Sequence, residues 1–425
     1  MDEGGGPRDQ WMNTDAYVAP DVGSFAQDGG ALCGDAVSFG SALKVSPDEG
    51  SDGGIHVHFG VSVAGGADGG TYLGWMDRDI TNASVGDVRV AAVSGSQVTG
   101  KALERPEGCD LMLDPVVAVA AGGKALLAVA CATGSEKEAS RTQILLYTSD
   151  DGFAKVEGPS RLKDCYAVTE RCLDPWVTVS QDGKVYVGWT KHAIESGVEV
   201  GMAAVVARSD DGTTIAEEFG IEGPFVATKA PRVAVDQGGT VHTAYVGWLD
   251  KEGASYVAHA TLGTAGFGTP DILGQGTAPS LALGDGGVVV VWTFEDNVYV
   301  AENAGAGFGA AVGVPLPSGT TAAYAPTVAI GHEGSVHLAW FAGDGSSWAI
   351  YYAVSEEVGG AFGEPLRVSG PFDADPTGET SPVHRIGRGG VWADVFGVRL
   401  VWGESGSTDP SHGTAGIYMA RRVCP

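Results

Sequence analysis

One hairpin pattern occurs five times in the sequence, and this repeat limits the fold more than any other feature. Each copy contains a proline, an alternating apolar triplet, a glycine-rich turn and a second alternating run, which ends in tryptophan or tyrosine in four copies. Period-two alternation predicts strands with two chemically different faces, and turns such as GDGG supply the backbone freedom that tight hairpins need. A series of small antiparallel sheets is therefore expected. The copies begin at Asp114, Asp174, Ala230, Ala278 and Ala325.

A third strand follows each hairpin, as in QILLYTSD or NVYVAEN, and a weaker fourth follows the third, as in EPLRVS. Four antiparallel strands that recur every ~40–60 residues are typical of β-propeller blades. The expected fold class is all-β: a single seven-bladed β-propeller of four-stranded antiparallel blades, with a six-bladed ring as the competing count. The blade starts lie near Ile55, Val116, Trp176, Arg232, Ser280, Thr327 and Val383.

The two ends of the sequence complement each other. The last repeat stops after three strands, whereas SALKVSPDEG near the start resembles GEPLRVSGPF of the preceding blade. We expect Ala42 to Ser46 to supply the missing outer strand, because this closes the ring and removes an exposed sheet edge. The prediction is one propeller domain over residues 41–425, preceded by a flexible arm over residues 1–40. No run approaches the ~20 apolar residues that span a bilayer.

The aromatic residue that ends the hairpin is predicted to be structural. A large ring at the same position of each sheet packs between neighbouring sheets. His242 and His337 share one repeat position with Tyr186, so they are also predicted to be structural. The recurring aromatic residues are Trp189, Tyr245, Trp292 and Trp340.

Charge limits the partners of this chain. It has 53 acidic and 25 basic residues, a formal net charge of -28. Such a surface repels phosphate backbones, which excludes a nucleic-acid partner. We expect a monomer whose partner is a glycan or another cell-surface ligand.

Six cysteines, an even number, favour disulfide bonds and an oxidising compartment. Cys165 and Cys172 bracket a short loop, Cys109 and Cys131 flank one strand pair, and the connectivity stays open. We expect a secreted or cell-surface protein, extracellular or periplasmic, whose export signal is not in this sequence; the opening MDEGGGPRDQ resembles a tether left after its removal. The remaining two cysteines lie near the termini, at Cys33 and Cys424.

Two of the third strands end in similar turns, TSDDGF and RSDDGT. They resemble the Asp-box of sialidase-like (BNR repeat) β-propellers, a Ser/Thr-x-Asp-x-Gly turn usually followed by an aromatic residue. The first copy matches at Thr148, Asp150 and Gly152, and the second has Arg208 in place of the hydroxyl residue. The resemblance implies a sialidase-like fold, because Asp-boxes in that family are structural turns at the blade periphery.

The resemblance also implies which residues an active sialidase would need: three arginines for the substrate carboxylate, a tyrosine nucleophile with a glutamate, and an aspartate acid/base. Arg232 and Arg385 lie near blade starts, where two of those arginines would be. No third arginine stands in an equivalent place, so the motif set of an active sialidase is incomplete here.

A ligand site is expected on one face of the propeller, around the central channel, where two sets of loops open. The loops that enter the inner strands contribute Asp114, Asp174, Arg232, Tyr324 and His384. The loops that join the second and third strands contribute Asp77, Asp79, Lys191, His192, Asp250, Glu295, Asp296, Asp344 and Glu404.

Carboxylates in these loops suit two kinds of chemistry. Glycoside hydrolysis uses a pair of carboxylates as acid and base or nucleophile, and Asp174 and Glu404 are the catalytic candidates. Clustered carboxylates also bind Ca²⁺, the one cofactor that the sequence leaves open. The third alternative is that acidic loops on an acidic protein are only solvated. The candidate metal ligands are Asp77, Asp79, Asp373, Asp375 and Glu379.

Two tryptophans are additional to the repeat. Tyr245 already fills the aromatic position of its blade, which predicts that Trp248 lies in the following loop, and Trp348 lies in a similar loop. Exposed aromatic rings beside carboxylates stack sugar rings. The alternative is that both rings fold back and pack.

These observations favour an extracellular recognition module that binds carbohydrate through the loop face. Its predicted ligand-binding residues are Arg232, Trp248, Asp250, Trp348, Asp114, Asp174 and His384. One alternative is a carbohydrate-active enzyme, a sialidase-like glycoside hydrolase or a polysaccharide lyase that uses carboxylates of the same funnel. Another is a protein-interaction scaffold. No GxSxG, P-loop or HExxH motif is present.

Overall fold

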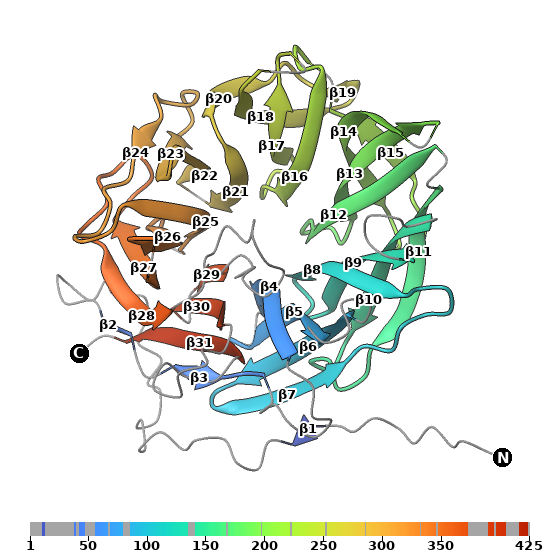
Figure 1. Ribbon diagram of the computed structural model, residues 1–425, viewed down its shortest axis with the longest axis horizontal. Helices are drawn as coiled ribbons and strands as arrows, with labels where there is room; N and C mark the ends of the chain where they lie inside the picture. The colour runs from blue at the N-terminus through green and yellow to red at the C-terminus, as the bar shows by residue number, and fades with distance from the viewer. Residues whose placement is uncertain are drawn as a thin grey trace.

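The computed structural model confirms the all-β, seven-bladed propeller (Figure 1). The sheets follow one another around a central opening, and the chain runs once around the ring, so that its last strands lie beside its first blade. In the described part of the chain, no helix is long and apolar enough to cross a membrane. The described residues are 11–12, 38–39, 42–46, 56–66, 69–79, 86–134, 141–166, 169–196, 198–221, 223–250, 253–284, 286–331, 333–345, 347–372, 390–394, 397–404 and 416–423.

The first three blades have four antiparallel strands each. Blade 1 consists of β4 (His56–Gly65), β5 (Thr71–Asp79), β6 (Gly86–Ser94) and β7 (Gln97–Ala102). Blade 2 consists of β8 (Leu111–Val119), β9 (Ala125–Thr133), β10 (Arg141–Ser149) and β11 (Glu157–Tyr166). Blade 3 consists of β12 (Glu170–Val179), β13 (Val185–Glu195), β14 (Val198–Ser209) and β15 (Glu217–Gly220).

The next three blades repeat this order. Blade 4 consists of β16 (Ala227–Val235), β17 (Val241–Trp248), β18 (Ser255–Gly263), β19 (Gly266–Phe267) and β20 (Asp271–Gln275). Blade 5 consists of β21 (Thr277–Gly284), β22 (Gly287–Phe294), β23 (Asn297–Asn303) and β24 (Val312–Gly313). Blade 6 consists of β25 (Ala322–Ile330), β26 (Val336–Gly343), β27 (Trp348–Ser355) and β28 (Leu366–Phe372).

Blade 7 joins the two ends of the chain, as the sequence predicted. Its strands β29 (Gly390–Asp394), β30 (Gly397–Glu404) and β31 (Gly416–Val423) are completed by β3 (Leu43–Lys44), which pairs antiparallel with β31. The residues before β3 also reach the ring, since β2 (Ser38–Phe39) pairs with β31 and β1 (Trp11–Met12) pairs with β7.

The described inner strand of blade 7 is β29. We expected this strand to start near Val383, which lies outside the described residues. Within β29, Gly390 pairs with Val401 and Asp394 pairs with Gly397 of β30. The described strand therefore includes Gly390, and its hairpin with β30 follows Asp394.

The repeated aromatic residues form the core between blades, as predicted. Each is at most 2% exposed. They occupy the same position of the second strand: Trp189 follows Gly188, the partner of Trp176, and Trp292 follows Val291, the partner of Ser280. Rings buried between the sheets fix the distance from each blade to the next. Blade 2 has Val129 at this position. The series is Trp75, Trp189, Tyr245, Trp292, Trp340 and Trp402.

Two repeat histidines are structural, as predicted. His337 lies between the Ser335 hydroxyl, 2.9 Å from its Nε2, and the Tyr352 hydroxyl, 2.7 Å from its Nδ1. His242 Nδ1 lies 3.1 Å from His259 Nε2. Burial lowers the pKa of His337 to about 3 and that of His259 to about 3, so both rings are neutral at pH 7.

The two turns that resemble Asp-boxes use a different register from the one that we read in the sequence. Ser149 Oγ accepts the Phe153 N–H at 2.9 Å, and Asp151 Oδ1 accepts the Lys155 N–H at 2.8 Å. The paired hydroxyl and carboxylate therefore lie one residue later than Thr148 and Asp150. The doublets TS and DD place a hydroxyl and a carboxylate two residues apart in either register, and only the earlier register also has glycine at the last position. The hydrogen bonds nevertheless use the later pair, Ser149 and Asp151.

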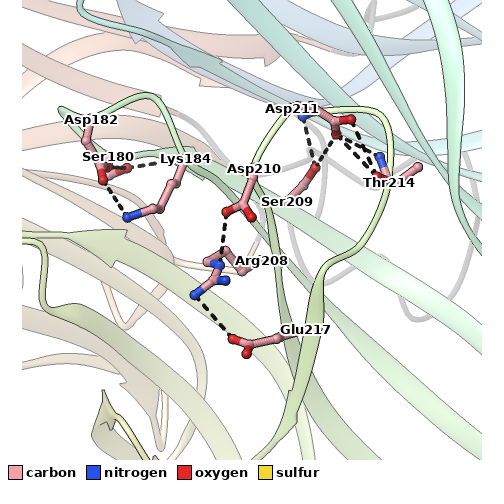
Figure 2. A network of polar contacts seen from close by, with 10 residues as sticks. Ser180, Asp182, Lys184, Arg208, Ser209, Asp210, Asp211, Thr214 and Glu217 are labelled. Carbon is pink, nitrogen blue, oxygen red and sulfur yellow. Dashed lines mark hydrogen bonds and ion pairs between the residues drawn. The ribbon is translucent and has the colours of Figure 1, made fainter.

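The second copy has the same arrangement (Figure 2). Ser209 Oγ accepts the Gly212 N–H at 2.9 Å, and Asp211 Oδ1 accepts the Thr213 N–H at 2.8 Å. The Thr213 hydroxyl and the N–H groups of Thr213 and Thr214 hold the pKa of Asp211 well below its usual range. Arg208 does not replace the hydroxyl residue. It forms ion pairs beside the turn, with Asp210 at 3.2 Å and Glu217 at 3.2 Å.

Candidate ligand site in the central channel

A cavity of about 310 Å³ lies where the inner strands converge. The inner strand of every blade contributes to its lining: β4, β8, β12, β16, β21, β25 and β29. The site is therefore composite, with one short segment from each blade. It is lined by residues of the inner strands themselves, whereas the sequence placed the ligand face on the loops.

A shared backbone irregularity shapes this lining. Each of five inner strands shifts its register at the residue before its proline, as between Leu173 and Trp176. A bulge of this kind bends the strand and re-aims the side chains that follow it. The residue before the proline is left-handed in all five: Asp114 (φ 50°), Asp174 (52°), Ala230 (52°), Ala278 (52°) and Ala325 (50°).

Three of the predicted ligand-binding residues meet in this cavity. Asp114 and Asp174 occupy the bulge position of neighbouring blades, and Arg232 follows the proline of the next blade. The sequence placed them together because the repeat puts them at equivalent points of successive inner strands. The aromatic rings in the lining belong to Trp176 and Trp392.

Asp174 is held in place by the second strand of its own blade. Thr190 Oγ1 donates to Asp174 Oδ2 at 3.0 Å and accepts the Ala230 N–H of blade 4 at 2.8 Å. Thr190 is fully buried, so this link is dry and directional. Asp114 has a different setting, because Ala130 occupies the position of Thr190 in blade 2.

Arg232 forms part of the wall. Its side chain is buried, its guanidinium carbon lies 4.7 Å from the centroid of the Trp176 ring, and Nη1 donates to the Pro231 carbonyl at 3.1 Å. The Trp176 ring is itself fixed, since its Nε1–H donates to the Val233 carbonyl at 2.8 Å. The guanidinium is therefore locked in a stacked geometry against the indole.

Trp248 and Asp250 lie apart from the cavity lining. We predicted Trp248 in a loop, but it is the last residue of β17, paired with Ala227 and Ser255. Its ring is half-buried and lies 5.1 Å from the Lys229 ammonium. Asp250 is exposed just beyond the strand. A part for either residue in ligand binding stays a prediction.

Trp348 packs into the protein, which is the second of the two alternatives for it. It begins β27 and is 4% exposed. Its ring lies against Gly343, where any Cβ would overlap it, and 5.4 Å from the ring of Tyr324. A short hairpin turn brings the indole back onto the preceding strand. The prediction that Trp348 is an exposed ring on which a sugar stacks is therefore wrong.

The acidic loops close on neighbouring groups, and this weakens the predicted carboxylate funnel. Glu170 pairs with Lys191 at 2.6 Å, and Asp344 Oδ1 accepts the Ser347 N–H at 2.9 Å. His192 Nδ1 lies 3.0 Å from Glu199, and Asp296 accepts the Tyr324 hydroxyl proton. The first and third of these pairs join neighbouring strands, β12 with β13 and β13 with β14.

The predicted metal ligands are only partly within the described residues. Asp77 is buried and forms an ion pair with Arg89, which engages this carboxylate. No group of three or more His, Cys, Asp or Glu side chains in the described ranges has a geometry that would hold a metal ion. The side chains of Asp79 and Glu404 lie outside the described part of the structure, as do the following residues: Asp373, Asp375, Glu379 and His384.

Sequence reasoning missed three hydroxyl residues in the lining, which occupy the same strand position as Arg232. Each accepts the N–H of the next inner strand: Ser62 Oγ accepts that of Val117 at 3.0 Å, and Ser280 Oγ accepts that of Val328 at 3.3 Å. Thr327 Oγ1 accepts the N–H of Val391 at 3.4 Å. The repeat alignment contained the signal, since Ser280 and Thr327 each directly follow the repeat proline.

Two disulfides brace the strands that carry the carboxylates. Cys109 is bonded to Cys131, which ties the segment before β8 to β9. Cys165 is bonded to Cys172, which ties the end of β11 to the start of β12. The disulfides expected from the even cysteine count are therefore present around Asp114 and Asp174. The remaining cysteines, Cys33 and Cys424, lie outside the described residues.

No protein-family model and no curated protein matches this sequence. Among solved structures, a protein of unknown function from Dyadobacter fermentans matches over 91% of this chain and 98% of its own, with a TM-score of 0.53 and 10% identity. The α-L-arabinanase of Penicillium chrysogenum, solved with arabinobiose, matches over 71% of this chain and 94% of its own, with a TM-score of 0.53 and 14% identity. A Hadza microbial sialidase matches over 83% of this chain and 76% of its own, with a TM-score of 0.47 and 14% identity. At these identities the likeness concerns the fold alone, and it agrees with the β-propeller expected from the sequence.

Proposed function

We propose that this protein is an extracellular recognition module that binds carbohydrate in the central channel. The observation that carries the proposal is the mixed chemistry of the cavity wall. Proline rings and two indoles line it beside three hydroxyl residues and the Asp174 carboxylate. Sugar sites combine apolar surfaces for ring C–H groups with a few fixed polar groups for the hydroxyls.

Two further observations support this proposal. The arabinanase of similar fold was solved with a disaccharide, so this fold can carry a carbohydrate site. The two disulfides favour an oxidising environment, in keeping with a secreted or cell-surface protein. The lining also sits on rigid strands, which suits a preformed site.

A carbohydrate-active enzyme is the second candidate, because two carboxylates share the cavity. Asp114 and Asp174 come from adjacent blades, and glycosidases hold two carboxyl groups about 5–9.5 Å apart. Asp174 and Glu404 remain the catalytic pair proposed from sequence. A glycoside hydrolase or a polysaccharide lyase would use such residues, and Ca²⁺ stays a proposed cofactor for either function.

The test is a glycan-array screen in which released sugar is assayed in the same wells, with Ca²⁺ and with a chelator. Binding without product, lost in Asp174→Asn and kept in Asp182→Asn, would support the recognition module. Asp182 is a matched control, since its exposed carboxylate lies on the β12–β13 turn (Figure 2). Product release would establish the enzyme. Silence in both assays would overturn the proposal and favour a protein-interaction scaffold.

A further inference from the structure

We infer that the channel selects a neutral sugar unit and discriminates against acidic sugars. This inference rests on the proposed function and specifies the ligand of the same site. It follows from which hydrogen-bonding groups of the wall are already engaged and which remain for a ligand.

The wall offers hydrogen-bond donors from three blades. Ser62, Ser280 and Thr327 each use the hydroxyl oxygen to accept a neighbouring N–H. A hydroxyl group that accepts in this way keeps its own O–H for donation. No acceptor for these three protons is present among the described residues, and all three side chains are partly exposed in the cavity lining. Their O–H groups are therefore placed to donate to a ligand oxygen.

The wall offers an acceptor from the other side. Thr190 engages Oδ2 of Asp174, and Oδ1 has no partner within the described ranges. The link through Thr190 fixes the direction of the carboxylate, so that Oδ1 is available to accept a ligand O–H. A sugar hydroxyl both donates and accepts, which matches a wall with O–H donors in some blades and a carboxylate acceptor in another.

An acidic sugar fits this wall poorly. The Arg232 guanidinium, the cation of the lining, stacks on Trp176 and donates to the carbonyl of Pro231. A ligand carboxylate would lie near the negatively charged Asp174. The whole chain also has a net charge of -28. Like charges at short range weaken binding, and a negative surface also slows the approach of an anion.

The cavity also limits the size of the ligand. The volume of about 310 Å³ lies at the lower end of small-molecule sites, so the wall would enclose the end of a glycan and leave its remainder outside.

The test compares matched ligands on the intact protein by saturation-transfer NMR and calorimetry. The probes are methyl glycosides of glucose, galactose, mannose and arabinose, with the uronic-acid counterparts of the hexoses. We expect at least one neutral glycoside to bind, with its uronic-acid counterpart at least about tenfold weaker. Asp174→Asn should weaken the neutral ligand by about tenfold or more and strengthen the uronic acid, because it removes the charge and keeps the shape.

A second pair of variants tests the donors. Thr327→Val should weaken the neutral glycoside by about 2- to 12-fold, while Thr327→Ser keeps the hydroxyl and should bind as the parent does. Asp182→Asn is the matched charge control and should change nothing. Equal or tighter binding of a uronic acid would overturn the selectivity and leave carbohydrate recognition standing. Failure of every glycoside and of the glycan array would overturn the proposed function itself.

Discussion

Two halves of the channel wall have the same backbone and different side chains. In the charged half, β8, β12 and β16 place Asp114, Asp174 and Arg232 around the proline. In the hydroxyl half, β21 and β25 have alanine before the proline and Ser280 or Thr327 after it. The left-handed φ lies between 50° and 52° in both halves.

This comparison separates what the fold needs from what the site contains. Ala278 and Ala325 hold the same left-handed bulge as Asp174 without any carboxylate. The bulge therefore comes from the proline and the register shift of the inner strand, and the fold does not require an acid there. The Asp174 carboxylate is then available to serve a ligand through Oδ1.

The largest expected effect tests whether both halves have one framework. Trp189→Ala in the charged half and Trp292→Ala in the hydroxyl half should each lower the free energy of unfolding by about 3–5 kcal/mol, because each indole is fully buried between sheets. Urea unfolding at pH 7 measures both. A difference of more than about 2 kcal/mol between the two variants would break the equivalence of the halves.

The second prediction concerns pH, since each half has one buried neutral histidine: His259 in blade 4 and His337 in blade 6. Burial lowers the pKa of each to about 3, below the unfolded value near 6.5. Their contribution to stability is full above about pH 6.5 and is lost as the pH falls toward 3, by about 1.4 kcal/mol per pH unit for each ring. The urea midpoint should therefore fall between pH 6.5 and 4.

This prediction is checked by the change in the free energy of unfolding per pH unit in single variants. His337→Gln should remove about half of the pH dependence in that window, and NMR titration of the remaining ring should show no protonation above pH 4. A ring that titrates near 6.5 in the folded protein would contradict the account.

The third prediction uses two threonines at equivalent positions. Thr190→Val should lower the free energy of unfolding by about 1–3 kcal/mol, because Thr190 bonds both Asp174 and the Ala230 N–H. Thr293→Val in blade 5 should be neutral or stabilising, since the buried Thr293 hydroxyl has no partner within the described residues. Differential scanning calorimetry compares the pair, and equal losses would show that the polar link to Asp174 is not specific.

The smallest effect concerns the strain of the bulge itself. Ala325→Gly should stabilise the protein by about 0.5 kcal/mol, because a left-handed alanine costs about 1–2 kcal/mol and glycine loses part of that gain through chain entropy. Thermal unfolding with Ala278→Gly as the parallel variant measures it. A clear destabilisation of both would mean that the alanine methyl groups matter for packing.

Much of the fold was predictable because its signals are local. Alternation, glycine turns and terminal aromatic residues recur at fixed spacing, and they identified the blades, the packed aromatic layer and the closing strand near Leu43. The same repeat register brought together Asp114, Asp174 and Arg232, since equivalent positions of successive blades face one channel.

The remaining features depend on contacts that sequence spacing does not contain. Trp348 folds back because Gly343 leaves room for it on the neighbouring strand. Asp77 is engaged because Arg89, two residues beyond its register partner Asp87 in the adjacent strand, reaches it diagonally. The hydroxyl donors were missed because serine and threonine at a strand position look ordinary until the next blade supplies the N–H that engages the oxygen.

The central claim is that Asp174 serves a ligand and is dispensable for the fold. The most direct measurement is Asp174→Ala, assayed for the free energy of unfolding and for glycan affinity in the same preparation. The account predicts a loss of stability below about 1.5 kcal/mol, for the one hydrogen bond from Thr190, and a loss of glycan affinity of tenfold or more. A loss of stability above about 3 kcal/mol with unchanged glycan affinity would contradict it.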